Sequence, residues 1–127
     1  MIYSFDYDST YDPAIPLVEV KIRKVEEDTF IQIPAIVDSG AGGTLIPMHF
    51  IQQIGAAKSG WMRIVNLDSV SRRIPRYLLH ISIGTLTIGA IQVGGDNSIP
   101  QMILGRDFLN HFIVTLNGLA NEVQISQ

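Results

Sequence analysis

Cysteine is absent from the 127 residues of this sequence. Its absence excludes disulfide bridges, a thiol nucleophile and thiolate-bound metals together. No run of about 18 apolar residues occurs, so no segment is expected to span a membrane. The opening segment, Met1–Asp6, has neither the basic start nor the apolar run of a secretory signal, and the chain is expected to be soluble and cytoplasmic.

Charge is also sparse, at 17% of residues with a net charge of −3. A mildly acidic chain has no overall attraction for nucleic acid or an anionic membrane, and neither is expected as a partner. Hydrophobic residues make up 46%, which suits an ordinary packed core. The length fits a single domain over residues 1–127, in which residues 1–12 are expected to form a mobile arm.

Short strands separated by turn residues dominate the predicted secondary structure. Apolar and polar residues alternate from Leu17 to Val25, the pattern of a half-buried strand. The continuous apolar runs at 35–37 and 102–104 suit strands buried on both faces. Further strands are predicted at residues 30–37, 44–46, 63–67, 76–83, 86–88, 90–93, 113–116 and 122–125, with a turn at 94–97 and a hairpin at 117–118.

Two short helices complete this pattern. One begins after Pro47 and ends at Gly55, and the other covers one or two turns between Asp107 and Phe112. Many short strands with so few helical residues predict an all-β fold, either a barrel or a sandwich.

Asp38 occupies an unusual place, directly after a buried strand and before the glycine-rich segment Gly40–Gly43. A carboxylate that leaves water needs hydrogen bonds or a partner. Glycine lets the backbone turn sharply and lets another chain approach closely. The hydroxyl of Ser39 could lock the loop by hydrogen bonding. These features suit an acid that a rigid loop presents at the floor of a cleft.

Two segments resemble the signatures of the retropepsin-like aspartic proteases. Ala35–Ala41 matches the apolar, Asp, Ser or Thr, Gly, Ala signature, and Ile103–Leu109 resembles the second signature, two apolar residues and glycine before a short helix. The segments Pro13–Val20 and Thr44–Pro47 are similar to bacterial single-domain members. The resemblance extends over about residues 13–125 and implies an all-β, closed barrel-like acid protease fold of one lobe, with one or two short helices.

The resemblance also implies a homodimer. Hydrolysis in this family needs one carboxylate as a base for water and one carboxylic acid at the carbonyl oxygen, and two close carboxyls share a proton, as aspartic proteases do. This chain has one Asp-Ser-Gly sequence, so the second Asp38 must come from an identical subunit across a two-fold axis. The implied activity is peptide hydrolysis on a protein or peptide substrate, without a metal or cofactor.

Roles for other residues follow from the same resemblance. Ser39 and Gly40 are expected to support the two aspartates. Substrate contacts are expected from Gly40, Ala41, Gly42, Leu67 and Ile103, and a structural role under the loop from Leu104, Gly105 and Arg106.

Two positions depart from the family pattern. A flap that closes over bound peptide is predicted at Val65–Ser71, which lacks the glycines of viral flap tips. Gly42 stands where the viral enzymes carry an aspartate that pairs with the arginine matching Arg106. Either Arg106 has another partner, with Asp107 and a chain terminus as the candidates, or the dimer is held together differently.

Other functions fit these residues less well or stay open. A catalytically silent dimer that binds peptides or acts as a scaffold is the main alternative. A phosphate-binding loop at Gly40–Gly43 is rejected because the glycine spacing is wrong and no lysine follows. Ser39 lacks the G-x-S-x-G context of a serine nucleophile.

The remaining charged and aromatic residues suit solvated or packing positions better than a binding site. Asp6, Asp8 and Asp12 suit a solvated arm better than a calcium loop, and His49, His80 and His111 are too scattered for a metal site. The basic run Arg63, Arg72, Arg73 and Arg76 suits a solvated loop beside the cleft, with a preference for acidic substrates as the weaker hypothesis. Trp61 is either a packing residue or a substrate platform.

Overall fold

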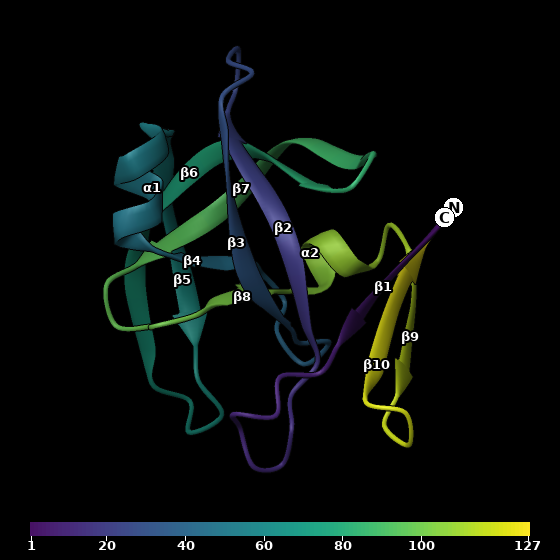
Figure 1. Ribbon diagram of the computed structural model, residues 1–127. Coiled ribbons are helices and arrows are strands. Elements are labelled where there is room, and N and C mark those ends of the chain that lie inside the picture. Colours follow the sequence, from purple (N-terminus) through teal and green to yellow (C-terminus); the bar gives the residue numbers. More distant parts are fainter.

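The computed structural model describes residues 1–127 as ten β-strands and two short helices (Figure 1). The elements are β1 (Ile2–Asp6), β2 (Leu17–Lys24), β3 (Phe30–Val37), β4 (Leu45–Pro47), α1 (Met48–Ile54), β5 (Ala57–Val65), β6 (Ser71–Ile83), β7 (Leu86–Asp96), β8 (Met102–Leu104), α2 (Arg106–Leu109), β9 (Ile113–Asn117) and β10 (Glu122–Ser126). No helix is long and apolar enough to cross a membrane.

Six strands close into a barrel in the order β2-β3-β8-β4-β7-β6, because β6 also pairs with β2. β5 extends the sheet beyond β6, and β1, β10 and β9 form a separate three-stranded sheet at one side (Figure 1). The all-β, closed barrel-like prediction is therefore confirmed.

Side chains that point alternately inward and outward along the strands form the barrel core. Val18, Val20 and Ile22 of β2 point inward and are at most 1% exposed, while the residues between them face outward. The apolar runs of β3 and β8 lie side by side in parallel, with Ile36 opposite Ile103. Both of these isoleucines are only half-buried, so the prediction of strands buried on both faces holds only in part.

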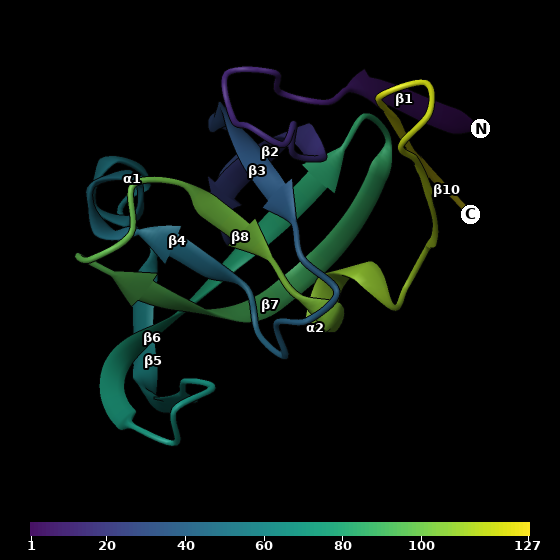
Figure 2. The same ribbon diagram turned by 90° about the horizontal axis from the view of Figure 1, so that it is seen from below.

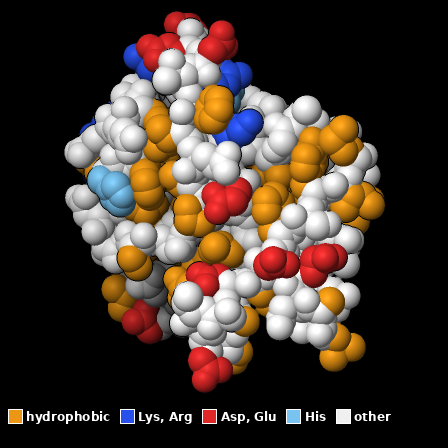
Figure 3. Space-filling view, viewed as in Figure 1, with side chains coloured by type: hydrophobic (Ala, Val, Ile, Leu, Met, Phe, Trp, Pro, Cys, Tyr) orange, Lys and Arg blue, Asp and Glu red, His pale blue; other side chains and the backbone are white.

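Charged side chains collect at the turn between β2 and β3, at the top of the space-filling view (Figure 3). Lys24 and Glu27 approach to 3.7 Å there, and both are well exposed. Such a solvated pair contributes little to stability. The charged turn keeps this end of the molecule hydrated, far along β2 and β3 from the Asp38 loop.

β7 is longer than predicted and runs through the expected turn at residues 94–97. Gly94 and Gly95 pair in parallel with Leu45 and Ile46 of β4. A Cβ on Gly94 would lie 2.5 to 2.8 Å from side-chain atoms of Ile74, Met62 and Leu45. The glycine is therefore needed for close packing, and not for the turn that its sequence context suggested.

The N-terminal segment is also different from the prediction, since part of the expected mobile arm forms β1. Its pairing with β10 runs from Ile2 opposite Ser126 to Asp6 opposite Glu122. The hydroxyl of Tyr3 accepts a hydrogen bond from the backbone N–H of Thr85 at 2.9 Å. These contacts attach the segment to β10 and to the β6–β7 turn.

We expect Gly84→Ala to weaken this attachment. Gly84 has φ +57°, and a Cβ there would lie 2.1 to 2.5 Å from atoms of the Tyr3 side chain. Backbone strain and displacement of Tyr3 should together lower the free energy of unfolding by about 2 kcal/mol. The control is Gly118→Ala, because nothing lies within 4 Å of a Cβ there. Urea unfolding measures both, and equal stabilities would contradict the Tyr3 anchor.

Candidate active site

Two segments far apart in sequence meet at the end of the barrel. β8 lies between β3 and β4, so the end of β3 is next to the start of α2. Asp38 is the first residue after β3, and its N–H donates to the carbonyl of Leu104 at 3.1 Å. Figure 2 shows the loop between β3 and β4 passing beside α2. The two predicted signature segments are thus one structural unit.

The loop after β3 fixes the carboxylate of Asp38. The N–H of Gly40 donates to Oδ1 of Asp38 at 2.9 Å, and the N–H of Ala41 donates to its backbone carbonyl at 3.1 Å. A Cβ on Gly40 would lie 3.2 Å from the same Oδ1, so a side chain would crowd the acid. Asp38 itself is half-buried, and Oδ2 has no hydrogen-bond partner within the chain. One oxygen is therefore held and the other is available.

Ser39 is exposed beside Asp38, and its hydroxyl makes no hydrogen bond within the chain. Its predicted bond across a dimer stays a prediction.

The start of α2 holds the other half of the loop. The N–H groups of Arg106 and Asp107 donate to the carbonyls of Ala41 and Gly42 at 2.9 and 3.3 Å. A helix leaves its first amides without internal partners, and the loop supplies them here. A Cβ on Gly105 would lie 2.6 Å from backbone atoms of Gly43, so this position has room for glycine alone. The predicted structural role of Gly105 thus has a steric basis.

A buried hydrogen-bond pair that the sequence did not reveal locks this junction. Thr44 is fully buried; its Oγ1 donates to Oδ1 of Asp107 at 2.7 Å, and its N–H donates to Oδ2 at 3.0 Å. The same hydroxyl accepts the N–H of Gly105 at 3.1 Å. In the sequence, the one sign of this contact is an acid in the first turn of the predicted helix. That position favours a carboxylate but does not indicate which residue binds it.

Arg106 finds a partner that was not among the predicted ones. Its Nη1 donates to the backbone carbonyl of Ser39 at 2.7 Å, while Asp107 is occupied by Thr44. Arg106 therefore joins α2 to the residue next to Asp38 without an acidic side chain. A Cβ on Gly42 would lie 3.6 Å from Nη2 of Arg106, which is ordinary contact distance.

We expect Gly42→Asp to stabilise the loop, because the side chain of the new aspartate would lie beside Nη2 of Arg106. The gain in the free energy of unfolding should be about 0.2 to 1 kcal/mol, the usual range for an exposed ion pair. Gly42→Asn is the matched uncharged control. Thermal unfolding at low and high salt measures the effect. A gain that is equal for both variants, or insensitive to salt, would contradict an ion pair.

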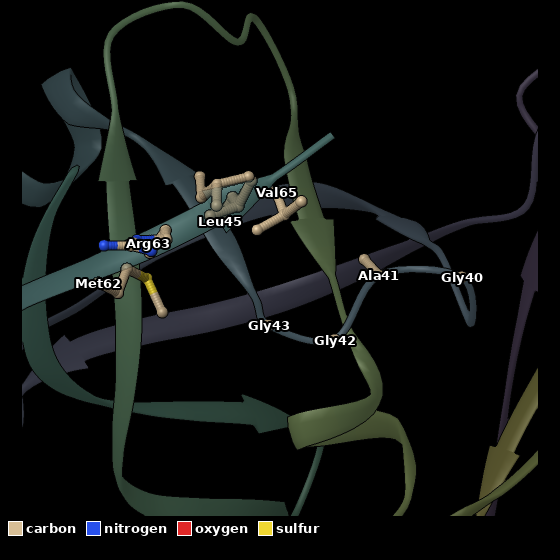
Figure 4. A pocket seen from close by; sticks show the side chains of 9 residues that line it. Gly40, Ala41, Gly42, Gly43, Leu45, Met62, Arg63 and Val65 are labelled. Atoms are coloured by element: carbon tan, nitrogen blue, oxygen red, sulfur yellow. The ribbon is translucent and has the colours of Figure 1, made fainter. Parts of the chain in front are cut away.

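An open cavity of about 410 Å³ lies between the loop and β5 (Figure 4). The loop contributes its glycines and Ala41, and the opposite side comes from β4 and β5. The lining residues are Gly40, Ala41, Gly42, Gly43, Leu45, Met62, Arg63, Ile64 and Val65. Three of the predicted substrate contacts, at positions 40 to 42, line the cavity.

The other two predicted contacts lie elsewhere. Leu67 is fully exposed at the tip of the β5–β6 hairpin, and Ile103 lies in β8; neither lines the cavity. Both roles stay predictions.

The hairpin of β5 and β6 carries the predicted flap segment at its tip. Without glycine, the turn is made by other means: the N–H of Asn66 donates to the carbonyl of Val70 at 3.0 Å, and Oδ1 of Asp68 accepts the N–H of Val70 at 3.0 Å. Ser69 adopts the left-handed conformation with φ +66°. An aspartate-stabilised turn therefore replaces the glycine-rich tip.

Three of the four arginines of the basic run contact other residues of the chain. Arg72 forms a two-pronged ion pair with Asp96, and Nη2 of Arg76 donates to the carbonyl of Ser59 at 2.9 Å. The guanidinium of Arg73 lies 4.2 Å from the ring centre of Trp61. Trp61 is half-exposed and also contacts Lys58, so its observed contacts are with cations of its own hairpin. Arg63 is the member of the run that lines the cavity.

The pair between Arg72 and Asp96 ties the hairpin to the end of β7. Asp96 is 2% exposed, and it also accepts hydrogen bonds from the N–H and Oγ of Ser98 at 2.8 and 2.7 Å. The hydrogen bond from Arg72, helped by those from Ser98, lowers the pKa of Asp96 to about 2 against the opposing effect of burial. A carboxylate with so low a pKa stabilises the fold when it is ionised.

We expect Asp96→Asn to lower the free energy of unfolding by about 2 kcal/mol at neutral pH, since the pKa of Asp96 falls from 3.8 to about 2. Because the folded-state pKa is depressed, this contribution is complete above pH 4 and is lost as the pH falls toward 2. The stability gap between wild type and variant should therefore close over that interval. Urea unfolding at several pH values measures it, with exposed Asp28→Asn as the control. A gap that persists at pH 2 would contradict the assignment.

The histidines do not assemble into a site. Nδ1 of His80 accepts the N–H of Ala90 at 2.8 Å, and burial, with Arg23 nearby, lowers its pKa. No three side chains among His, Asp and Glu gather into a group that could hold a metal ion.

Comparison with known proteins gives a clear result at the level of structure. No protein-family model and no curated sequence matches the chain. The structure is similar to the EIAV protease in complex with the inhibitor HBY-793, with a TM-score of 0.61 and 20% identity over 76% of this chain and 86% of that one. A retropepsin-like aspartic protease from Rickettsia conorii matches with a TM-score of 0.66 and 12% identity over 98% and 91%.

The retroviral protease-like domain of Ddi1 from Leishmania major matches with a TM-score of 0.53 and 18% identity, over 88% of this chain and 94% of that one. Such low identities establish a shared fold and no more. The chain therefore has the fold of the retropepsin-like aspartic proteases, as its two signature segments indicated.

Proposed function

We propose that this chain is one subunit of a homodimeric aspartic endopeptidase, with Asp38 of each subunit forming the catalytic pair. The observation that carries the proposal is the placement of Asp38. Its carboxylate is held through Oδ1 by the N–H of Gly40, on a loop that lines a cavity under the β5–β6 hairpin. The retropepsin-like fold supports the same interpretation.

One chain supplies only half of the required chemistry. A two-fold axis near Asp38 would bring two carboxyls together, and their mutual repulsion would leave one protonated and one ionised. The ionised carboxyl takes a proton from water, whose oxygen attacks the peptide carbonyl, while the protonated carboxyl gives its proton to the carbonyl oxygen. Collapse of the tetrahedral intermediate then returns a proton to the leaving nitrogen and breaks the C–N bond.

The cavity suits an extended peptide. Glycines at positions 40, 42 and 43 line one side without side chains, and the strand β5 forms the opposite wall. An extended chain between them could pair by backbone hydrogen bonds, in the manner of an added strand. Leu67 would contact substrate only if the hairpin tip moved inward, and Arg63 is the candidate for a preference toward acidic side chains.

We expect Asp38→Asn to abolish peptide hydrolysis, with a loss of roughly 10²- to 10⁴-fold, because the amide cannot accept a proton from water. The purified protein is incubated with a peptide library at acidic to neutral pH, and the products are followed by mass spectrometry. The matched control is Asp28→Asn, which alters an exposed acid between β2 and β3, far from the Asp38 loop. Unchanged hydrolysis by the Asp38 variant would contradict the proposal.

A pepstatin-type inhibitor separates this function from its main alternative. Binding together with loss of hydrolysis supports the enzyme. Binding by a wild-type protein that cleaves nothing in the library favours a silent peptide-binding dimer on the same fold.

A further inference from the structure

Charge is unevenly divided along this chain. Residues 39–95 hold five of the nine Lys and Arg residues but only one of the twelve acids, Asp68. All five cations belong to the β5–β6 hairpin, which extends beyond the barrel (Figure 1). A chain with a net charge of −3 therefore carries one strongly basic element.

The two faces of this hairpin differ in character. Successive side chains of a strand point to opposite faces. Met62 and Ile74 point toward Gly94 of β7, where both would meet a Cβ placed on that glycine. Trp61 and Arg63, which flank Met62, therefore lie on the opposite face, and both are exposed.

Two more cations join Trp61 and Arg63 on this face. Arg73 of β6 pairs directly with Arg63 in the register of the hairpin. Lys58 is on the same face because the register shifts between Lys58 and Gly60, and its ammonium lies over the Trp61 ring. All four side chains are exposed. They define the cationic face: Lys58, Trp61, Arg63 and Arg73.

Trp61 holds two of these cations in place. Nζ of Lys58 lies 3.7 Å from the ring centre, and the guanidinium carbon of Arg73 lies 4.2 Å from it. Lys58 precedes Trp61 along β5, whereas Arg73 is paired with the residue two positions after it, so the cations reach the ring from its two sides. Such contacts order the side chains but leave their charge in place, which lowers the entropy lost when an anion binds.

No acid of the chain balances this face. The ion pairs of the structure are Lys24 with Glu27 and Arg72 with Asp96, and neither involves the cationic face. Arg63 and Arg73 stand directly opposite each other, an arrangement in which like charges destabilise a pair of strands. A local conflict without a compensating contact is typical of a functional surface. The missing negative charge is therefore expected on a partner.

The shape of the face favours an acidic peptide over other anions. The row from Lys58 to Arg63 is roughly 15 Å long, which suits four or five residues of an extended chain. Because cations occupy both sides of the Trp61 ring, the ring is not free to stack on a base of a nucleic acid. Asp68 lies among the exposed apolar residues of the hairpin tip, where an acid opposes insertion into a membrane.

We infer that the cationic face binds an acidic segment of a protein partner. Carboxylates of that segment pair with the guanidinium groups of Arg63 and Arg73 and with the ammonium of Lys58. On the proposed function, on which this part of the inference rests, the partner is the substrate. Arg63 also borders the cavity beside the Asp38 loop, so a peptide on the face can continue into the cavity. The acidic segment then lies outside the residues that are cleaved.

The first test measures binding without hydrolysis. All proteins carry Asp38→Asn, and fluorescence anisotropy at low salt follows a labelled peptide with four consecutive glutamates. Lys58→Gln combined with Arg73→Gln should raise its dissociation constant about fivefold or more, because two exposed charge pairs are lost. Raising the salt to about 0.5 M should abolish binding, since these charges are solvated.

The matched control is Lys21→Gln combined with Lys24→Gln, which removes the same charge from β2. Lys21 also lies over an aromatic ring, that of Phe30. This control should leave the dissociation constant within twofold, and a peptide with four glutamines should not bind. Circular dichroism checks that both double variants are folded. Equal weakening by the two double variants, or equal binding of the glutamine peptide, would overturn the inference.

Two further anions test the choice of partner. A four-nucleotide oligothymidylate, similar to the glutamate peptide in charge, should bind more weakly than that peptide, and phosphatidylserine vesicles should not retain the protein. Tighter binding of the oligonucleotide, or retention on the vesicles, would overturn the inference if the Lys58 and Arg73 double variant abolishes it. Either result would identify a nucleic acid or a membrane as the partner of this face.

Kinetics test the role in substrate binding. A peptide that the wild-type protein cleaves is extended by four glutamates or by four glutamines. KM should be about fivefold lower for the glutamate extension, and the Lys58 and Arg73 double variant should lose this difference while kcat stays unchanged.

The outcomes separate the surface from the chemistry. Binding of the glutamate peptide through Lys58 and Arg73, without hydrolysis of any peptide, supports the cationic face and contradicts the protease. Hydrolysis that depends on Asp38 but is the same for both extensions supports the protease and contradicts the inference.

Discussion

The parallel pairing of β3 with β8 is the contact on which the rest of the site depends. It places the residue after β3 beside the residue after β8, so that the loop from Asp38 to Thr44 rests directly on the start of α2. The loop carbonyls accept the first amides of the helix, and Asp107 binds both the hydroxyl and the N–H of Thr44. The backbone polar groups at this junction are therefore satisfied, and the loop gains the rigidity that a preorganised acid requires.

Several groups on and beside this loop have no partner within the chain. One oxygen of Asp38 is held by Gly40, the hydroxyl of Ser39 has no partner in the chain, and the apolar groove beside Ser39 is open. Ser39 itself lines that groove, so the exposed hydroxyl and the apolar surface lie next to Asp38. Arg72 and Asp96 attach the β5–β6 hairpin to the end of β7.

Much of the fold could be predicted because its signals are local. Alternation located β2, and continuous apolar runs located the end of β3 and all of β8, to within a residue or two; Gly55 ends α1 in the left-handed conformation as expected. The prediction failed where a distant contact decided the outcome. Gly94 looked like a turn residue, but its lack of a side chain serves packing against Met62, Ile74 and Leu45. Likewise, β1 is held by β10 and by Thr85, neither of which its own sequence indicates.

By itself the sequence determined that the acid Asp38 stands between a buried strand and a run of glycines, because this follows from residue types in a short, ordered segment; that the acid acts in two copies stays a prediction. Only the tertiary structure decided which groups support that acid. Arg106 binds the carbonyl of Ser39, Asp107 binds Thr44, and β9 is left with an open edge. Each of these depends on which strands become neighbours in the sheets. Neighbours in a sheet are set by long-range burial and pairing, and a local pattern does not specify them.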